Sequence, residues 1–131
     1  MIGTFSLIVG SGLIAILYGY IVARQILSSS PGNSKMQEIA AAIQEGARAY
    51  LNRQYKTIAI VGIIILIIIT YALGIWVGLG YFIGAFLSAT AGYVGMLVSV
   101  QANVRTAEAS RKSLSAGLNI SFKSGAVTGM L

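Results

Sequence analysis

Residues 57–104 read TIAIVGIIILIIITYALGIWVGLGYFIGAFLSATAGYVGMLVSVQANV, and this run contains no charged side chain and no histidine. One helix that crosses the hydrocarbon core of a bilayer needs about 20 apolar residues. The run is therefore long enough for two crossings, and glycines at 74, 78 and 80 indicate a turn near its middle. We predict membrane helices over residues 57–77 and 81–104, joined by a tight non-cytoplasmic turn at 78–80.

The composition of the whole chain is typical of an integral membrane protein. Of its 131 residues, 56% are hydrophobic and 9% are charged, whereas soluble domains contain about 25% charged residues. Residues 1–23 also lack charged side chains, and they do not begin with the positive residues of a secretory signal. We therefore expect a permanent first membrane helix over residues 2–23.

A polar segment separates the first two predicted membrane helices. Residues 27–33 read LSSSPGN, which is typical of a loop, and Ser34 with Gln37 has the pattern of a capping box. Across residues 35–56 the apolar side chains recur in steps of three and four, which predicts an amphipathic helix. No helix breaker follows, so we expect this cytoplasmic helix to continue directly into the second membrane helix.

Small residues repeat at every fourth position in the third predicted membrane helix. Such rows let helix backbones approach closely in lipid, so we expect this helix to pack among others, whereas the Ile-rich second helix faces lipid. The first row is Gly84, Ser88 and Gly92, and the second row is Ala91, Gly95 and Ser99, with Asn103 at its end.

The end of the chain repeats the alternation of polar and apolar segments. Residues 105–123 are polar, and residues 124–131 are apolar but too few to cross a bilayer. We expect residues 124–131 to be the incomplete start of a fourth helix, and the chain to be part of a longer protein. Together these elements predict an all-α integral membrane helical bundle with three full transmembrane helices plus the start of a fourth.

The distribution of charge predicts the orientation in the membrane. All nine lysines and arginines lie in residues 24–56 and 105–123. Because positive residues collect in cytoplasmic loops, we expect both segments to be cytoplasmic and the N-terminus to be non-cytoplasmic. Contacts with lipid headgroups then account for the net charge of +6, and we expect no nucleic-acid partner.

The residue types that build catalytic and metal sites are scarce in this chain. It has no Cys, His or Asp, and its acidic residues are Glu38, Glu45 and Glu108. Metal-assisted hydrolysis of a phosphoanhydride needs carboxylates on the metal ions, and an ion path normally needs ionisable groups inside the bilayer. We therefore predict no catalytic, cofactor-binding or metal-ligating residue here.

Two groups of side chains have alternative interpretations. Glu45, Arg48 and Arg53 form either a functional cytoplasmic cluster or a solvated helix face with one weak Glu45–Arg48 pair. Three tyrosines either contact a ligand or anchor and pack the helices. We favour the solvated face and the packing role. The tyrosines are Tyr50, Tyr55 and Tyr93.

Three groups of motifs carry a family resemblance. They are GNSKMQEIA (32–40), IQEGA (43–47) and AYLNRQY (49–55); GAFLSA (84–89), AGY (91–93), GM (95–96), VSV (98–100) and ANVRTA (102–107); and SGAVTGM (124–130). The first group resembles the cytoplasmic approach to the second helix of membrane-integral pyrophosphatases, which are pyrophosphate-energised proton or sodium pumps. The second group resembles that family's third helix, and the last resembles the start of its fourth.

The resemblance implies a function for the longer protein. It implies a homodimeric pump that couples hydrolysis of pyrophosphate to transport of H⁺ or Na⁺, with Mg²⁺ as cofactor and K⁺ as a second candidate ion. The first four helices of the family belong to an outer ring, and the acidic motifs that bind magnesium pyrophosphate follow later. This segment would then be a scaffold, packed on the remaining helices of the pump and inactive alone.

Two other functional classes are alternatives to the pump. One is a non-enzymatic membrane scaffold or assembly module that uses the small-residue face of residues 84–103. The other is an ion-coupled secondary transporter without pyrophosphatase activity, which the family motifs argue against. The sequence does not distinguish H⁺ from Na⁺ as the transported ion, because the family's determinants lie downstream.

Overall fold

The computed structural model describes residues 2–131, and this part of the chain consists of helices without a strand. Helices α1, α2 and α3 are each long and apolar enough to cross a membrane. The all-α, multi-pass architecture predicted from the hydropathy is therefore confirmed. The helices are α1 (Ile2–Leu27), α2 (Ser34–Leu73), α3 (Ile75–Ser110) and α4 (Leu114–Met130).

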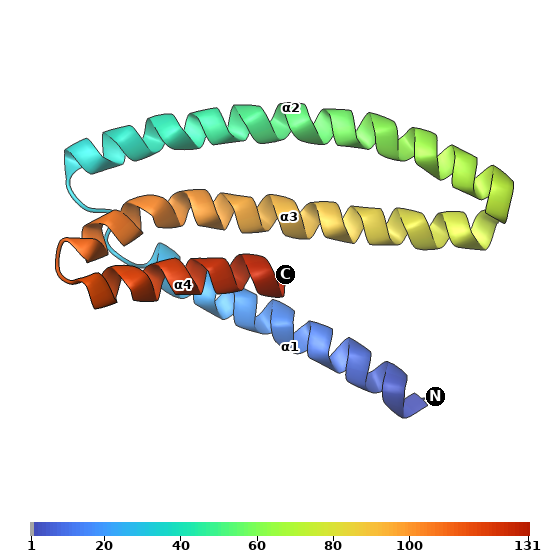
Figure 1. The fold of residues 1–131 in the computed structure, drawn as a ribbon, viewed down its shortest axis with the longest axis horizontal. Helices are drawn as coiled ribbons and strands as arrows, with labels where there is room; N and C mark the ends of the chain where they lie inside the picture. The colour runs from blue at the N-terminus through green and yellow to red at the C-terminus, as the bar shows by residue number, and fades with distance from the viewer. Residues whose placement is uncertain (1) are drawn as a thin grey trace.

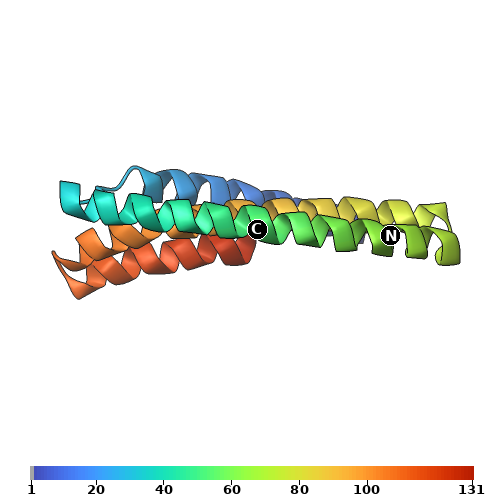
Figure 2. The same cartoon turned by 90° about the horizontal axis from the view of Figure 1, so that it is seen from above.

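The helices form two consecutive antiparallel hairpins with α1 added at one end (Figure 1). Helices α2 and α3 lie side by side along their lengths, and α4 folds back along the C-terminal half of α3. Helix α1 contacts α4 and α3 near its own C-terminal end, and its N-terminal half diverges from the bundle. Figure 2 shows that the bundle is thin in the perpendicular direction.

The core lies where α1, α3 and α4 meet. It consists of Val22 and Ile26 from α1, Val98 and Ala102 from α3, and Val127 from α4. Ile26, Ala102 and Val127 are each only 1% exposed. Elsewhere the long helices present large apolar side chains outward, as lipid-facing helices do. The junction of α1, α3 and α4 therefore holds the buried core of the residues that the structure describes.

The start of α2 differs from the predicted capping box. The N-cap is Asn33, whose side-chain oxygen accepts a hydrogen bond from the Met36 amide at 3.0 Å. The expected cap, Ser34, is already helical. The expected partner Gln37 instead donates its side-chain amide to the Gly32 carbonyl at 2.9 Å. The prediction was wrong by one residue because Asn and Ser are equally good N-caps and they stand next to each other here.

Helix α2 is continuous through both the polar and the apolar segment. Its 40 residues correspond to a length of about 60 Å at 1.5 Å per residue. The polar segment over 35–56 and the second apolar span are thus one rigid helix. The hydrocarbon core is only about 30 Å thick, so a large part of α2 extends beyond it.

The turn between α2 and α3 lies at Gly74, not at the predicted 78–80. Gly74 has φ 96° and ψ 165°, a conformation that is essentially restricted to glycine. Residues 78–80 belong to α3, and Gly78 is buried. A Cβ atom at Gly78 would collide with the Thr70 hydroxyl oxygen. Gly78 therefore serves the close approach of the two helices, which is why the glycine-rich stretch does not form the turn.

Helix α4 begins ten positions before the predicted start of the fourth helix, at Leu114 rather than residue 124. Ser113 is its N-cap and accepts a hydrogen bond from the Ala116 amide at 3.1 Å. The polar segment 105–123 is consequently the end of α3, a short turn and the first part of α4. The prediction was wrong because hydropathy marks entry into lipid, whereas helix formation depends on capping and propensity. For the same reason α1 extends beyond the predicted limit at residue 23 and α3 beyond the predicted limit at residue 104. The earlier turn at Gly74 explains why α2 ends before residue 77 and α3 begins before residue 81.

Candidate functional site at the junction of three helices

Arg105 on α3 binds the C-terminal end of α1. Its guanidinium donates to the Leu27 carbonyl at 3.0 Å, to the Ser29 carbonyl at 3.2 Å and to the Gln101 carbonyl of its own helix at 2.7 Å. The carbonyls at a helix C-terminus carry partial negative charge and lack partners within the helix. A half-buried cation at this position is therefore satisfied by backbone oxygens instead of a carboxylate.

The remaining carbonyls at the end of α1 are also bonded. The amides of Ser28 and Ser29 donate to the carbonyls of Arg24 and Ile26, each at 3.0 Å. Both serine hydroxyls donate to the Gln25 carbonyl, at 2.8 and 3.2 Å. With the bond from Arg105, each of the four terminal carbonyls of α1 has a donor. The run of serines in the loop thus caps α1, and Arg105 completes the cap from another helix.

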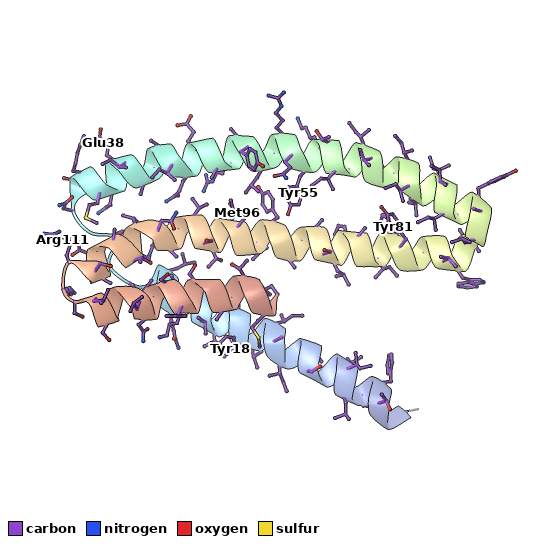
Figure 3. The ribbon with its side chains drawn as sticks, in the orientation of Figure 1. Tyr18, Glu38, Tyr55, Tyr81, Met96 and Arg111 are labelled. Atoms are coloured by element: carbon purple, nitrogen blue, oxygen red, sulfur yellow. The ribbon has the colours of Figure 1, made fainter. Side chains whose placement is uncertain are left out.

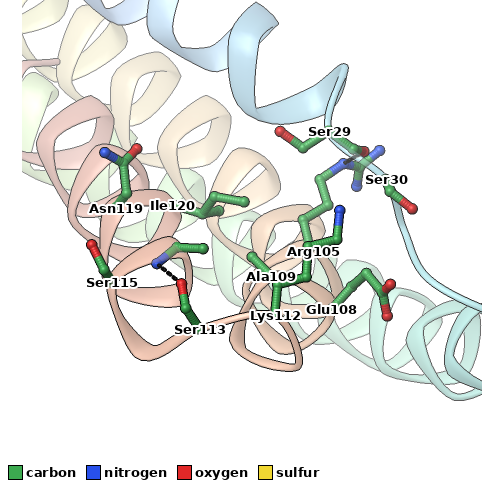
Figure 4. A pocket seen from close by; sticks show the side chains of 11 residues that line it. Ser29, Ser30, Arg105, Glu108, Ala109, Lys112, Ser113, Ser115, Asn119 and Ile120 are labelled. Carbon is green, nitrogen blue, oxygen red and sulfur yellow. Dashed lines mark hydrogen bonds between the residues drawn. The ribbon is translucent and has the colours of Figure 1, made fainter.

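A polar pocket of about 600 Å³ opens beside Arg105 (Figure 4). It lies between the α1–α2 loop and the α3–α4 turn. Hydroxyl, amide and charged side chains line it, together with Ala109, Ala116 and Ile120. The polar lining side chains are Ser29, Ser30, Arg105, Glu108, Lys112, Ser113, Ser115 and Asn119.

The three carboxylates of this chain lie apart from one another. Glu38 pairs with Lys35 at 3.0 Å, Glu108 pairs with Arg111 at 3.0 Å, and Glu45 is exposed on α2. In the part of the chain that the structure describes, no three His, Cys, Asp or Glu side chains come close enough to hold a metal ion. A site for Mg²⁺ needs oxygen ligands gathered at one point, and these residues do not fit that requirement.

The structure does not assemble the alternative cluster on α2, and Glu45, Arg48 and Arg53 are exposed, in line with the solvated helix face that we favoured. Among residues 2–131 the ion pairs are Lys35–Glu38 and Glu108–Arg111. Glu45 and Arg48 therefore do not form the predicted pair.

The three candidate tyrosines have different environments. Tyr55 points from α2 toward α3 (Figure 3), where its ring meets the Tyr93 ring edge to face at 5.3 Å. Tyr50 is 60% exposed. Tyr55 and Tyr93 therefore pack the α2–α3 hairpin, in line with the interpretation favoured above.

The two rows of small residues on α3 face different neighbours. In the second row, Gly95 is buried against α4, and the Thr128 hydroxyl donates to the Gly95 carbonyl at 3.5 Å. In the first row, Gly92 meets Tyr55, but Gly84 has no atom within 4 Å of where its Cβ would lie. Ser88 is also exposed. Within residues 2–131 the first row is thus covered only at its Gly92 end.

Arg105 is the main residue whose role the sequence did not reveal. In the sequence it was one of the positive charges that mark the predicted cytoplasmic side. Its partners Leu27 and Ser29 lie 78 and 76 positions away, so no local pattern connects them. Two features of the sequence were available as a signal. Arg105 is the first cation after a long uncharged run, and a serine-rich segment stands far upstream of it, at the end of the first helix.

The comparison with known proteins gives one consistent result. The chain matches the family described as "Inorganic H+ pyrophosphatase" over residues 13–131. It is 47% identical over 122 residues to the K(+)-insensitive pyrophosphate-energized proton pump of Methanosarcina mazei, covering 92% of this chain and 18% of that protein. It is 41% identical over 127 residues to the K(+)-insensitive pyrophosphate-energized proton pump 2 of Moorella thermoacetica, covering 96% of this chain and 19% of that protein.

A third relative, from Clostridium tetani, is provisionally named a K(+)-stimulated pyrophosphate-energized sodium pump. It is 42% identical over 120 residues, which cover 92% of this chain and 18% of the relative. The chain thus spans less than a fifth of the length of each of these relatives.

Proposed function

Since the chain belongs to the inorganic H⁺ pyrophosphatase family, we propose that it forms the N-terminal, outer-ring part of a pump that couples pyrophosphate hydrolysis to transport of H⁺ or Na⁺. The observation that carries the proposal is the match over residues 13–131, which includes α2, α3, α4 and the part of α1 from residue 13 onward. The relatives differ in the ion and in the K⁺ dependence that their names state. We therefore leave the transported ion and the K⁺ requirement open in the proposal.

The proposed role of this segment is structural. Its three carboxylates are dispersed over α2 and α3, and residues 57–104 contain no Asp, Glu, His, Lys or Arg. Hydrolysis of a phosphoanhydride depends on metal ions and cations that stabilise the developing charge. We propose that the pump binds Mg²⁺ and pyrophosphate outside residues 1–131, while this segment supports those elements by packing.

The proposed orientation has the N-terminus outside the cytoplasm. The α1–α2 loop and the α3–α4 turn lie at the same end of the bundle, and the Gly74 turn lies at the opposite end (Figure 1). Arg24, Lys35, Arg105 and Lys112 all belong to the first end. This segregation of positive charge supports a cytoplasmic position for that end. The homodimer implied by the family remains part of the proposal.

The experiment that tests the proposal uses the full-length protein. We expect purified protein in lipid to hydrolyse pyrophosphate only when Mg²⁺ is present, and to lose activity when the metal is chelated. A matched control is the same preparation after heat inactivation, which measures chemical hydrolysis. A folded full-length protein that does not hydrolyse pyrophosphate would refute the proposal that it is a pyrophosphate-driven pump.

A second candidate function is a membrane assembly module, and the uncovered first row on α3 favours it. Gly84 offers an open backbone surface, whereas Gly92 is already in contact with Tyr55. Gly84→Leu is therefore the better test, because Gly92→Leu would also disturb the α2–α3 hairpin. If residues 1–131 form a specific oligomer in a bilayer, Gly84→Leu should abolish it. An oligomer that survives this change would reject the module.

A further inference from the structure

The pocket beside Arg105 gathers two cationic side chains. Figure 4 shows Arg105 of α3 and Lys112 of the α3–α4 turn reaching toward the α1–α2 loop. Glu108 also lines the pocket, but its carboxylate is bonded to Arg111 at 3.0 Å. Two like charges that face one small space repel each other. An anion in this space would relieve that repulsion and would gain two charge-assisted contacts.

The other polar side chains of the pocket suit the oxygen atoms of a phosphate group. Ser30 and Ser115 provide hydroxyls, and Asn119 provides an amide. The Ser30 oxygen accepts a bond from the Gly32 amide, which leaves its hydroxyl hydrogen free to donate outward. Arg105 is already held by three carbonyls, so its guanidinium is fixed before any ligand arrives. The volume of about 600 Å³ is ample for a phosphate group with its nearest substituents.

The depth of the pocket matches that of lipid phosphates. Arg24 ends the uncharged part of α1, and Leu27, which Arg105 binds, lies about 5 Å further along the helix. The headgroup layer extends about 5–8 Å beyond the hydrocarbon core. On α4, Lys123 contacts Gln25 of α1, so α1 and α4 leave the apolar region at the same level. The pocket is thus placed at or just outside the headgroup layer.

We propose that this pocket binds a phosphate group, supplied either by the headgroup of an anionic phospholipid or as a free phosphate anion. The inference rests on the proposed function only in placing this end of the bundle at the cytoplasmic surface. The contacts themselves come from this chain. Arg105 and Lys112 bind the phosphate oxygens, while Ser30, Ser115 and Asn119 line the rest of the pocket.

The first arm of the test measures lipid binding to the full-length protein in detergent. Phosphatidylglycerol and phosphatidylcholine are titrated separately, and bound lipid is counted by native mass spectrometry. Loss of one charged contact weakens binding about tenfold, so Lys112→Gln should lower the affinity for phosphatidylglycerol by that factor. The control is Lys35→Gln, which removes an equal charge from a side chain that is 72% exposed and paired with Glu38. It should bind phosphatidylglycerol as the wild type does.

The second arm measures binding of inorganic phosphate in bilayer discs made only of phosphatidylcholine. Wild-type protein and Lys112→Gln are compared. The phosphate binding that this substitution removes is binding at the pocket, and the binding that remains belongs to other phosphate sites of the protein. Asn119→Leu provides a second variant, because it narrows the pocket without changing charge. It should weaken binding in whichever arm Lys112→Gln does.

Each outcome decides the proposal. Lys112-dependent binding of phosphatidylglycerol assigns the pocket to a lipid headgroup, and Lys112-dependent binding of inorganic phosphate assigns it to the free anion. Equal binding by the wild type, Lys112→Gln and Asn119→Leu in both arms would overturn it. Pyrophosphate hydrolysis by the same preparations tests the pump separately, since a protein can fail that assay and still bind phosphate at this pocket.

Discussion

The guanidinium of Arg105 donates to the carbonyl of Leu27 at 3.0 Å across 78 positions of sequence. This bond and its neighbour to Ser29 attach the end of α1 to α3. Helix α1 has few other fixed points, because its N-terminal half diverges from the bundle. The position of α1 therefore depends on Arg105, on the small core around Ile26 and on its packing against α4, which includes the Lys123–Gln25 contact.

Arg105→Gln should loosen α1. Hydrogen bonds to a charged group contribute about 1.5–3 kcal/mol each, and the remaining contacts of α1 are few. We expect a loss of about 2 kcal/mol in the free energy of unfolding measured in mixed micelles. Arg105→Lys should restore only part of it, because a lysine lacks the planar fork that reaches several carbonyls at once.

The same substitution can be followed by cross-linking. The chain contains no cysteine, and a Cβ at Gly19 would lie 3.5 Å from Cγ of Leu131. With cysteines at 19 and 131, a short cross-linker should join α1 to the end of α4 efficiently. Arg105→Gln should reduce the yield several-fold. An unchanged yield together with an unchanged unfolding free energy would show that Arg105 does not hold α1.

Gly78→Ala should destabilise the α2–α3 hairpin. The new Cβ would collide with the Thr70 side chain, and overpacking of this kind costs about 1–3 kcal/mol. Gly80→Ala is the matched control, since Gly80 has open space around it. The control should be neutral or slightly stabilising, because alanine is favoured over glycine in a helix by up to about 1 kcal/mol. Equal changes in stability for Gly78→Ala and Gly80→Ala would show that α2 and α3 do not make their close contact at Gly78.

Gly74→Ala should destabilise the turn for a different reason. No atom lies within 4 Å of where a Cβ would be, so there is no collision. The cost comes from φ 96° and ψ 165°, a region in which a residue with a Cβ is strained by about 1–3 kcal/mol. Gly46→Ala, in the helix with open space, should cause no loss of stability. Thermal unfolding of both variants in the same detergent provides the comparison.

The proposed orientation predicts opposite accessibility at the two ends of the α2–α3 hairpin. Trp76, next to the Gly74 turn, is 83% exposed, and Lys35 lies in the first turn of α2 at the other end. In sealed vesicles of known sidedness, Lys35→Cys should react with an impermeant maleimide from the cytoplasmic side and Trp76→Cys from the opposite side. Reaction of both cysteines from one side would contradict the topology.

Hydropathy and charge predicted the class of this fold because they report local preference for lipid. The uncharged runs mark α1, α2 and α3, and the absence of a breaker before the second span matches the continuity of α2. These features need no knowledge of neighbouring helices. The first and last residues of the helices, in contrast, depend on neighbouring helices or on which residue acts as the cap. The predicted helix starts at Ser34 and at residue 124 were wrong for this reason.

The glycines show why a single sequence underdetermines the turn. Gly74 and Gly78 are the same residue type in the sequence. In the structure Gly74 has a positive φ, whereas Gly78 leaves room for the Thr70 side chain because it has no Cβ. Only the position of the partner helix separates the two uses. The candidate site was missed for a similar reason, since Arg105 meets the end of α1 only after the chain has folded.

The coupling of hydrolysis to ion movement tests the central claim most directly. The full-length protein is reconstituted into sealed vesicles with Mg²⁺, and pH and Na⁺ are followed after pyrophosphate is added. We predict uphill uptake of one of the two ions, which stops when pyrophosphate is exhausted and collapses with an ionophore for that ion. Hydrolysis of pyrophosphate without any gradient of H⁺ or Na⁺ in tight vesicles would contradict the account.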